Sequence, residues 1–481
     1  MSGISEQDKA GVPLFIDLDG TLINSDLLYE SFFTLLRTRP LLCLLVPFWL
    51  LRGGKAYMKH MIAQHAGIDA AAIPYNQPFL EYLRNESATN RELVLATASN
   101  HELAGRIADH LGIFSGVIAS DAHSNLSGKR KLEMIRQWAG ARPFDYAANA
   151  RIDLTIWKHA RRGIVVNPAT GVLKAAGRVT DIERVFSADG TGLLTYLRAM
   201  RMYQWTKNVL LFVPLLTAHK FTSPSLIGHE LLAFAAFSLC SSGVYVLNDL
   251  LDLPADRAHP RKQQRPFAAG KLPLSHGILM ACLLPVAGLA IGYSISVQFL
   301  GILSLYLLMT SAYSIRFKAY AVVDVLLLAA LYTLRVFAGA SVIQVTLSFW
   351  LFAFSIFIFL SLALVKRCSE LVMMTATDRT TMSGRGYQLT DLAHLQMMGI
   401  SSGYLSILII ALYINSPDIV AQYTHPQGLW ILCPALLFWI SRVWLKTGRG
   451  EMHDDPLIFT IRDIGSQIVM LICVLAVVLS I

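Results

Sequence analysis

The stretch Asn248-Asp249-Leu250-Leu251-Asp252-Leu253-Pro254-Ala255-Asp256 follows an apolar block and precedes a basic loop. On a helix, Asp249, Asp252 and Asp256 stand at positions i, i+3 and i+7, which share one face. Three carboxylates this close repel one another unless a cation or another strong partner lies between them. Oxygen ligands at this density suit Mg²⁺, which commonly bridges to substrate phosphates. The stretch therefore predicts a magnesium site, and a solvated acidic loop is the alternative.

Apolar blocks of spanning length surround this motif, each close to the roughly 20 residues that a membrane helix needs. Nine are expected, near residues 203–219, 230–250, 274–293, 296–314, 320–341, 348–366, 393–414, 427–445 and 459–480. The loops after the even-numbered blocks carry nearly all the basic residues, and the other side carries only Lys220. Basic loops stay in the cytoplasm. We therefore expect an inner (cell) membrane protein with a cytoplasmic N-terminal domain and an external C-terminus.

The composition agrees with a bilayer as the main partner. The 481 residues are 54% hydrophobic and 15% charged, against about 25% charged in a typical soluble protein. A net charge of +9 is compatible with nucleic-acid binding, but the bases cluster in short loops, where membrane topology explains them. The six cysteines are scattered singly, without a zinc or redox spacing. No signal peptide is evident, because the early apolar run Val12–Ile16 leads directly into Asp17.

The first part of the chain has a different pattern, with short strands separated by helical stretches. Strand-like runs lie at 13–16, 93–96, 116–119 and 163–166. Strands spaced by helices predict an α/β domain with a doubly wound parallel sheet. We expect this domain over residues 1–184, with a helical cap at about 23–91. A linker at 185–200 and an all-α membrane bundle at 201–481 follow.

One segment of the predicted cap is unusually apolar. Pro40 to Leu51 contains about 12 residues, too few to cross a bilayer core. It is either a buried core helix or a segment that lies at the membrane interface.

The aspartate stretch resembles the first aspartate-rich motif of the UbiA-type intramembrane prenyltransferase superfamily, and residues 259–270 resemble its usual continuation. The resemblance covers roughly residues 195–481 and implies nine spans with bound Mg²⁺. Within the superfamily, the chain is more similar to polyprenyl-phosphate phosphoribosyltransferases, such as the decaprenyl-phosphate enzyme. The residues that carry this closer resemblance are Arg201, Gln204 to Asn208, Tyr313, Ser314, Lys318, Asp324, Leu334, Arg335, Lys366, Arg367 and Glu370.

The chain departs from general prenyltransferases at the expected second acidic motif. Lys366 and Arg367 stand there, with Glu370 as the only acid. Bases in place of acids favour a substrate with an additional phosphate, such as phosphoribosyl pyrophosphate. The resemblance implies that magnesium and the aspartates hold the pyrophosphate leaving group while a lipid phosphate attacks. The candidate substrate- and phosphate-binding residues are Asn248, Lys207, Arg257, Lys262, Arg265, Lys318, Lys366, Arg367 and Glu370.

Two features of the membrane half leave alternatives open. Arg335 lies about 15 residues into the fifth block, where an ionisable group either pairs inside the bundle or reaches the far surface. Asp454, Asp455 and Asp463 either join the site or cap the ninth helix.

The segment Phe15-Ile16-Asp17-Leu18-Asp19-Gly20-Thr21-Leu22 resembles motif I of the haloacid dehalogenase-like phosphohydrolase superfamily. The resemblance implies that Asp17 is the nucleophile and Asp19 the general acid/base. Thr97 fits the phosphate-binding hydroxyl of motif II.

The later motifs of this second family are matched less completely. Lys131 fits the lysine of motif III, with Lys129 as the alternative. In motif IV, Asn149 replaces the first carboxylate, so that Asp17, Asp19 and Asp153 remain as the expected magnesium ligands. An amide contributes no charge, and we therefore expect either a slow phosphatase with weak metal affinity or a domain that only binds phosphate.

The sequence favours a Mg²⁺-dependent transferase that moves 5-phosphoribosyl from phosphoribosyl pyrophosphate to a polyprenyl phosphate, with a fused domain that dephosphorylates the product. One alternative is a prenyltransferase that uses a prenyl diphosphate and an aromatic acceptor, with a degenerate regulatory domain. Another is a transporter or a phosphate-sensing receptor. The oligomeric state stays open.

Overall fold

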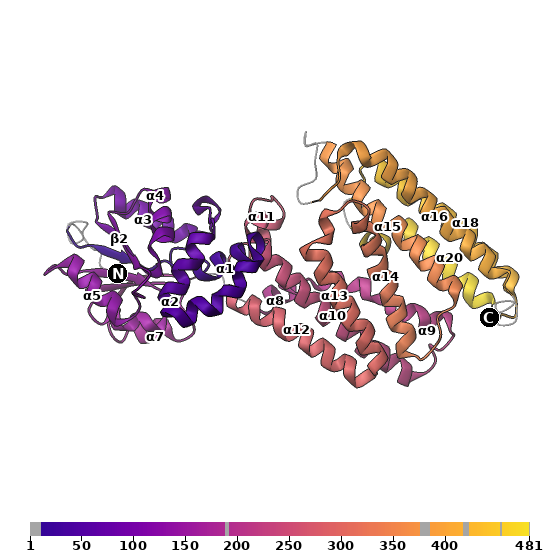
Figure 1. The fold of residues 1–481 in the computed structure, drawn as a ribbon, viewed down its shortest axis with the longest axis horizontal. Coiled ribbons are helices and arrows are strands. Elements are labelled where there is room, and N and C mark those ends of the chain that lie inside the picture. Colours follow the sequence, from indigo (N-terminus) through magenta and orange to yellow (C-terminus); the bar gives the residue numbers. More distant parts are fainter. Residues whose placement is uncertain (1–10, 188–191, 376–384, 417–422, 453–454, 481) are drawn as a thin grey trace. The chain divides into compact units, whose positions relative to one another are not determined.

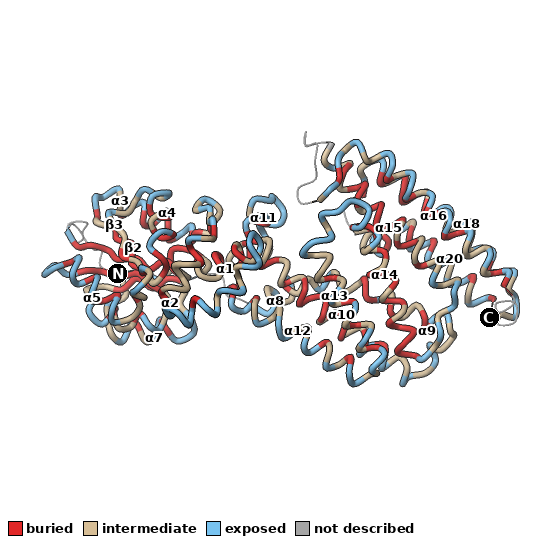
Figure 2. Tube along the Cα trace, viewed as in Figure 1, coloured by how far each residue is buried: buried red, intermediate tan, exposed pale blue. Residues whose placement is uncertain are grey.

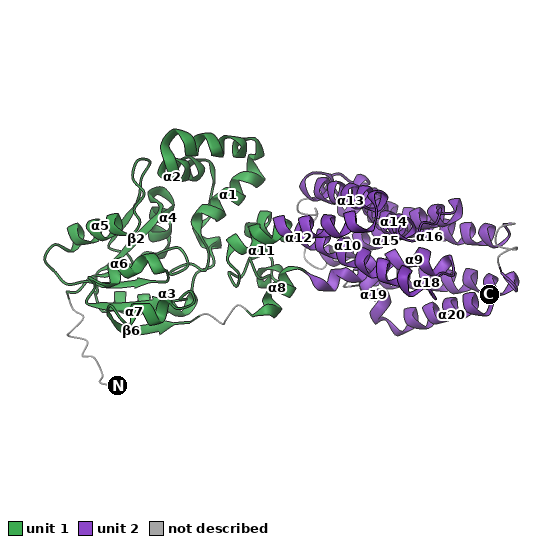
Figure 3. Cartoon of the chain, turned by 90° about the horizontal axis from the view of Figure 1, so that it is seen from below, with its two compact units in different colours: residues 1–200, 245–281 green, residues 201–244, 282–481 purple. Residues whose placement is uncertain are grey.

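The computed structural model describes residues 11–187, 192–375, 385–416, 423–452 and 455–480. Two compact units make up the chain, as Figure 3 shows. The first contains residues 1–200 together with 245–281, and the second contains residues 201–244 and 282–481. The aspartate stretch therefore belongs to the same unit as the N-terminal domain. The predicted domain bounds are drawn differently and stay a prediction.

A six-stranded parallel sheet forms the centre of the first unit, with the strand order β3-β2-β1-β4-β5-β6. The strands are β1 (Leu14–Ile16), β2 (Leu93–Asn100), β3 (Gly116–Ser120), β4 (Asp145–Ala148), β5 (Arg162–Val166) and β6 (Asp181–Phe186). The order reverses at β1, so consecutive crossovers lead to opposite edges, as in doubly wound folds. The parallel sheet predicted from the sequence is confirmed.

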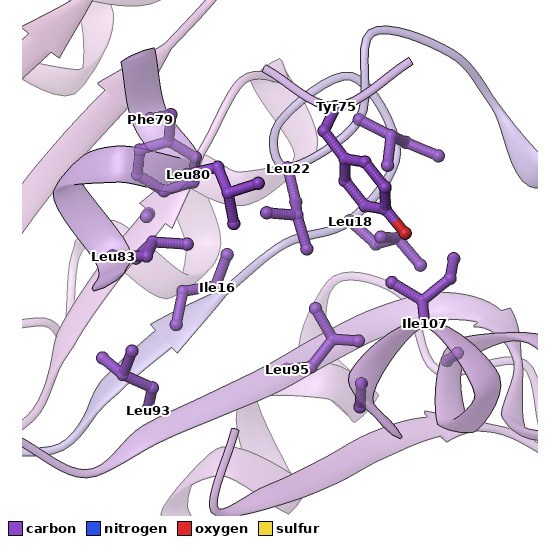
Figure 4. Packing of buried hydrophobic residues seen from close by; sticks show 14 of the residues in the cluster. Ile16, Leu18, Leu22, Tyr75, Phe79, Leu80, Leu83, Leu93, Leu95 and Ile107 are labelled. Carbon is purple, nitrogen blue, oxygen red and sulfur yellow. The ribbon is translucent and has the colours of Figure 1, made fainter. Parts of the chain in front are cut away.

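Alternation of side chains along the strands builds a core on each face of this sheet. Ile16 and Leu95 lie in one apolar cluster, and Phe15 and Val94 lie in the other. Figure 4 shows the first cluster, where Phe79 packs with residues of β1 and β2. The helices around the sheet are α3 (Gln77–Ala88), α4 (His101–Leu111), α5 (Lys129–Ala139), α6 (Leu154–Trp157) and α7 (Val172–Ala176). Burial on both faces explains why the strands read as continuous apolar runs.

The segment between β1 and β2 is helical, as expected for a cap. It contains α1 (Leu27–Thr38), the 3₁₀ helix η2 (Pro40–Leu45), α2 (Val46–His65), η3 (Ala70–Ala72) and α3. The apolar run at Pro40 to Leu51 is largely exposed, with Leu41, Leu44 and Leu51 each at least 76% accessible. The buried-core interpretation of this run is therefore wrong. The interfacial interpretation stays a prediction.

Long apolar helices dominate the rest of the chain (Figure 1). Within the described ranges, eight helices are long and apolar enough to cross a membrane, or up to nine if one bent pair is a single span. They are Pro40–His65, α10 (Pro224–Leu251), α12 (Leu274–Ile295), α13 (Val297–Ile315), α14 (Val323–Val342), α15 (Phe349–Thr375), Leu389–Ile414 with α16 (Leu392–Ile414), and Pro426–Gly448 with α18 (Leu432–Gly448). The bent pair is α19 (Pro456–Arg462) and α20 (Ile464–Ser480), at 84°. The predicted helical bundle is confirmed, but its exact count of nine spans is not.

The first predicted block differs from a regular membrane helix. It consists of the 3₁₀ helix η5 (Met202–Phe212) followed by the short α9 (Val213–Thr217). Pro214 stands in the first turn of α9 and has no backbone N–H to donate. Many residues of the long helices are exposed, and Figure 2 colours much of α12 and α16 as exposed or intermediate. Exposed leucines at these positions suit helices that contact lipid.

Candidate active sites

The first site lies in the loop that follows β1. Asp17 is 7% exposed, and its backbone N–H bonds to the carbonyl of Ala147 at 2.9 Å, which fixes the loop to β4. Its Oδ1 accepts a hydrogen bond from Lys131 Nζ at 2.8 Å. The hydroxyl of Thr21 donates to Oδ2 at 3.4 Å. A predicted nucleophile and a predicted phosphate-binding lysine, 114 residues apart in the chain, are thus in direct contact.

Asp19 is held in a different environment from Asp17. Its Oδ2 accepts a bond from Ser99 Oγ at 2.6 Å, and its Oδ1 accepts the backbone N–H of Leu27 at 2.8 Å. Burial raises the pKa of the Asp19 carboxyl from 3.8 to about 7, and the charge of Asp26 adds to the shift, although both hydrogen bonds oppose it. A carboxyl with this pKa carries a proton near neutral pH, as a general acid requires. The geometry suits the role predicted from the sequence.

Asp153 belongs to a buried network on the other side of Asp17. Tyr146 donates its hydroxyl to Asp153 Oδ1 at 2.8 Å, and Lys131 Nζ lies 3.2 Å from that hydroxyl. Lys131 Nζ is also 3.8 Å from Asp153. Burial, followed by the charge of Asp17, raises the pKa of Asp153 to about 6. Lys131, and not Lys129, is therefore the lysine that the fold places in the site.

Other polar groups complete this site. Thr97 is fully buried and lies inside β2, which extends to Asn100 and not only to Ala96 as predicted; its Oγ1 accepts the N–H of Ser99 at 3.0 Å. From the cap, Lys59 Nζ donates to the carbonyl of Ala98 at 2.7 Å. The sequence did not identify Tyr146, Ser99 and Lys59 as site residues. Ser99 lies in β2, Tyr146 in β4 and Lys59 in α2 of the cap, so only the fold brings them to this site.

The donor set of this site does not fit a magnesium ion as its side chains stand. Asp17, Asp19 and Asp153 each accept hydrogen bonds from protein donors. Among the residues that the structure describes, no group of three or more His, Cys, Asp or Glu could hold a metal ion. The side chain of Asn149 packs against Gly20, where a Cβ would lie 2.2 Å from its Nδ2. An amide therefore fills the place next to motif I that a carboxylate was expected to occupy.

The second site begins at the end of α10, in the first unit. The aspartate stretch does not form one continuous helix, because α10 ends at Leu251 and α11 (Leu253–Arg257) begins after Asp252. Pro254 lies in the first turn of α11 and restricts the residue before it. Asp249 and Asp256 are each 2% exposed. The break falls at Asp252, which lies between the two buried aspartates in the sequence.

One guanidinium nitrogen connects the two buried carboxylates. Arg265 Nη1 lies 3.1 Å from Asp249 Oδ1 and 2.5 Å from Asp256 Oδ2. The oxygens therefore converge on a single cationic point, and this donor pair fits a divalent cation if Arg265 moves. Asp252 is more exposed and lies 3.4 Å from Arg37 Nη1. Arg265 thus contacts two of the three predicted aspartates, and Arg37 contacts the third.

The other predicted phosphate-binding residues near the aspartate stretch lie at separate places. Arg257 Nη2 lies 2.6 Å from Glu30 Oε1 of α1, and its Nε donates to the carbonyl of Ala268 at 3.0 Å. Arg257 is thus committed to the cap and the loop backbone, and the predicted phosphate contact requires it to move. Lys262 is exposed in the short 3₁₀ helix η6 (Lys262–Gln264), and Asn248 precedes Asp249 in α10.

Within the second unit, two predicted phosphate ligands meet at one carboxylate. Asp455 Oδ2 lies 2.7 Å from Lys207 Nζ and 3.4 Å from Lys366 Nζ. Asp455 also caps α19, since its Oδ1 accepts the N–H of Leu457 at 3.2 Å. Although burial opposes it, the charges of Lys207 and Lys366 keep the pKa of Asp455 well below its usual range. Asp455 therefore caps a helix, as one alternative expected, and it also contacts two of the predicted phosphate ligands. Asp454 lies outside the described residues.

Arg367 is fully buried at the end of α15 and is neutralised by acids. It bonds to Asp324 of α14, and its Nη1 lies 2.5 Å from Glu370 Oε2. Tyr313 donates to the same Asp324 at 2.7 Å, and Arg385 pairs with Glu370. Arg367 is therefore a structural cation in this arrangement. Lys318 lies in the short helix η7 (Phe317–Ala319), after α13.

Arg335 pairs inside the bundle and does not reach a surface. It is 4% exposed and donates to Asn208 Oδ1 at 2.9 Å, to the carbonyl of Leu331 at 2.6 Å and to Tyr306 Oη at 2.9 Å. Its guanidinium also stacks on the rings of Tyr306 and Tyr332. The Arg335 side chain thus connects α14 with α13 and η5.

The fold joins a doubly wound domain to a set of helices of membrane-spanning length. The profile described as UbiA prenyltransferase family matches residues 209–455, which is half of the chain. The profile described as haloacid dehalogenase-like hydrolase matches residues 14–151. The chain thus belongs to the UbiA prenyltransferase family and carries a haloacid dehalogenase-like domain. Together with its apolar helices, this makes it an integral membrane protein.

Several known proteins are similar to all or part of the chain. The chain is 34% identical to "Uncharacterized protein y4nM" of Sinorhizobium fredii over 457 residues, which are 94% of this chain and 88% of that protein. It is 33% identical to the decaprenyl-phosphate phosphoribosyltransferase of Mycobacterium tuberculosis (strain H37Rv) over 185 residues, 38% of this chain and 61% of that enzyme. Among solved structures, a UbiA homolog from Archaeoglobus fulgidus bound to GPP and Mg²⁺ is similar, with 16% identity and a TM-score of 0.45, over 59% of this chain and 99% of that one.

Proposed function

We propose that the membrane half transfers a 5-phosphoribosyl group from phosphoribosyl pyrophosphate to a polyprenyl phosphate, and that the N-terminal domain then removes the 5-phosphate. The observation that carries the choice of donor is the pair Lys207 and Lys366, which converge on Asp455. The buried ammonium group of Lys207 and the partly exposed one of Lys366 thus lie against the same carboxylate. Such a cluster suits a phosphate group better than it suits a second magnesium site. The phosphoribosyltransferase relative supports the same choice.

The acidic pair Asp249 and Asp256 is the proposed ligand set for the metal that accompanies the pyrophosphate. Bound Mg²⁺ would supply neutralisation of the leaving group. In the transfer, the bond between the anomeric carbon and the pyrophosphate oxygen breaks, and an oxygen of the lipid phosphate forms the new bond. Arg265, once released from the two carboxylates, is positioned in this loop to neutralise pyrophosphate. Arg335, buried among neutral partners, acts in holding the helices and does not touch the donor.

The N-terminal domain contains the groups for the second reaction. An oxygen of Asp17 attacks the 5-phosphate, and Asp19 donates its proton to the departing 5-oxygen. Water then hydrolyses the acyl phosphate, with Asp19 as the base, and inorganic phosphate leaves. Lys131, 2.8 Å from Asp17, neutralises the charge of the phosphoryl group. The raised pKa of Asp19 suits both the donation and the later acceptance of a proton near neutral pH. We place this domain in the cytoplasm, with the basic loops.

The experiment uses the purified full chain in nanodiscs with a polyprenyl phosphate and phosphoribosyl pyrophosphate labelled at the 5-phosphate. The expected products are a lipid without the label and labelled inorganic phosphate. The Asp17→Asn variant should accumulate a lipid that keeps the label, since only the second reaction is blocked.

Two results would contradict the proposal in different ways. If the wild-type lipid product keeps the 5-phosphate as well as the lipid phosphate, only the proposed phosphatase role is contradicted. Transfer from a prenyl diphosphate to an aromatic acceptor, without reaction of phosphoribosyl pyrophosphate, would overturn the choice of donor. The Lys366→Met variant provides a matched test, because it should raise the KM for phosphoribosyl pyrophosphate.

A further inference from the structure

The cap of the N-terminal domain carries a surface that the two proposed reactions do not use. We call the exposed side chains of Leu41, Leu44, Phe48 and Leu51 the cap patch. Their exposed fractions are 79%, 76%, 56% and 86%. The positions follow the spacing i, i+3, i+7 and i+10, so they lie along one side of the η2–α2 segment. A patch of large apolar side chains on one side of a helix indicates a contact surface.

The opposite side of the same segment is packed. Trp49 is 5% exposed and forms a cluster with Leu35 of α1 and Ile62 of α2. The ring of Trp49 also stacks on His65. The segment is therefore anchored to its own domain from within, and the cap patch is held facing outward. It is a fixed feature of the fold and not a frayed end.

Charge identifies the kind of surface that fits the cap patch. Between Glu30 and Asp69 the sequence contains no acidic residue. The bases in this interval are Arg37, Arg39, Arg52, Lys55 and Lys59. Arg39 and Arg52 lie at the two ends of the cap patch, and both are exposed, as is Lys55. Apolar side chains bordered by bases, without acids, match an anionic lipid surface.

Pro40–His65 is long and apolar enough to cross a membrane, but it is not one regular helix. Gly54, with φ 70° and ψ −166°, breaks α2. From Pro40 to Gly54 the 3₁₀ and α-helical residues together span about 25 Å, which is shorter than a bilayer core of about 30 Å. Arg52 and Lys55 flank the break. These features suit a helix that lies in the interface, with one side in lipid and the other against the protein.

We infer that the cap patch docks on an anionic bilayer surface and holds the N-terminal domain against the membrane. The inference requires that the chain is membrane-embedded, but it does not depend on the identity of the donor. It deepens the proposed dephosphorylation, because a lipid-linked sugar phosphate is available only at that surface. The segment η2–α2 belongs to the cap, which also contributes Lys59 to the region of Ser99 and Ala98. Docking of the patch would therefore present the phosphatase site to a lipid-borne substrate.

The test uses the full chain in nanodiscs, with a photo-crosslinking amino acid in place of Leu44. Leu51 provides a second position in case one variant folds poorly, and Glu133, exposed on α5, is the control. We expect lipid adducts at Leu44 and Leu51, and none at Glu133. Adding phosphatidylglycerol to phosphatidylcholine nanodiscs should raise the adduct yield several-fold.

Charge variants separate lipid docking from other contacts. Arg39→Gln combined with Arg52→Gln and Lys55→Gln should remove the effect of phosphatidylglycerol. Adducts from Leu44 to a second copy of the chain, or to another segment of the same chain, would overturn the inference. Equal yields at Leu44 and Glu133 would overturn it as well. None of these readouts depends on transferase or phosphatase activity, so failure here is distinct from failure of the proposed function.

Discussion

Replacing Asp455 by Asn tests the basic cluster most directly. At an effective dielectric constant of about 20, contacts of 2.7 Å and 3.4 Å correspond to gross attractions of about 6 and about 5 kcal/mol. Most of this attraction offsets the cost of removing Asp455, Lys207 and Lys366 from water. Removing one partner of a buried pair typically costs about 3–5 kcal/mol, because a charge is left uncompensated. Asparagine can still cap α19. The expected loss is therefore electrostatic.

The assay is thermal unfolding in detergent, with and without pyrophosphate. Asp455→Asn should unfold at a lower temperature, and adding Lys207→Met should recover part of the loss, because it removes the uncompensated cation. Pyrophosphate should stabilise Asp455→Asn more than the wild type, since an anionic ligand no longer competes with Asp455 for the lysines. Asp391→Asn is the control, because its carboxylate accepts the N–H of Gln388 in an exposed bond.

An Asp455→Asn variant that is as stable as the wild type and gains nothing further from pyrophosphate would give the opposite result. It would show that Lys207 and Lys366 do not depend on Asp455 and do not form a phosphate site. Equal destabilisation by Asp391→Asn would point to helix capping or general charge effects.

Three further predictions concern single side chains. The pKa of Asp19 is raised from 3.8 to about 7 in the folded protein, so folding favours its protonated form. The free energy of unfolding of the wild type, measured with urea, should therefore fall relative to that of Asp19→Asn as the pH rises from about 4 to 7. A difference between the two proteins that does not vary with pH would contradict the raised pKa. Asn149→Asp restores a carboxylate beside Gly20, so hydrolysis of a phosphate monoester should become more responsive to Mg²⁺; an unchanged metal response would contradict this. Glu230 is fully buried in α10, and neither of its carboxylate oxygens has a hydrogen-bond partner within the described part of the chain. Glu230→Gln should therefore leave the midpoint of thermal unfolding unchanged or raise it. A large decrease in the midpoint would reveal a charged partner.

The sequence predicts the sheet well where the strands are buried on both faces. The runs at 93–96 and 163–166 are continuous and apolar, and β2 and β5 lie there. β4 was missed because Asp145 interrupts its apolar pattern; the acid is buried only because Arg91 and Arg161 pair with it. β6 contains exposed polar residues and lies at the sheet edge. β4 and β6 depend on tertiary contacts, which the apolar pattern of the sequence does not reveal.

The sequence identified residues of the candidate sites, but it did not predict which residues contact one another. Motif spacing identified Asp17 and Lys131, and the fold places them in contact. It also identified Arg257, but its partner Glu30 is more than 200 residues earlier in the chain. Local spacing cannot predict such a pair, which depends on how the cap helix α1 packs against the loop after α10. The same limit applies to Lys207 and Asp455.

Arg265 explains how Asp249 and Asp256 can both be buried. Two desolvated carboxylates need a counter-charge, and Arg265 Nη1 supplies one, at 3.1 and 2.5 Å. A divalent cation binding to this pair must displace the guanidinium, which costs affinity unless the freed arginine finds another anion. Pyrophosphate is such an anion. Mg²⁺ and pyrophosphate should therefore bind cooperatively in the wild type, and calorimetry should show each raising the affinity for the other. Arg265→Ala should bind Mg²⁺ alone more tightly, because nothing is displaced, and should lose most of the cooperativity. Weaker binding of Mg²⁺ to Arg265→Ala would contradict this exchange of arginine for metal. It would mean that Arg265 positions Asp249 and Asp256 and does not compete with Mg²⁺ for them.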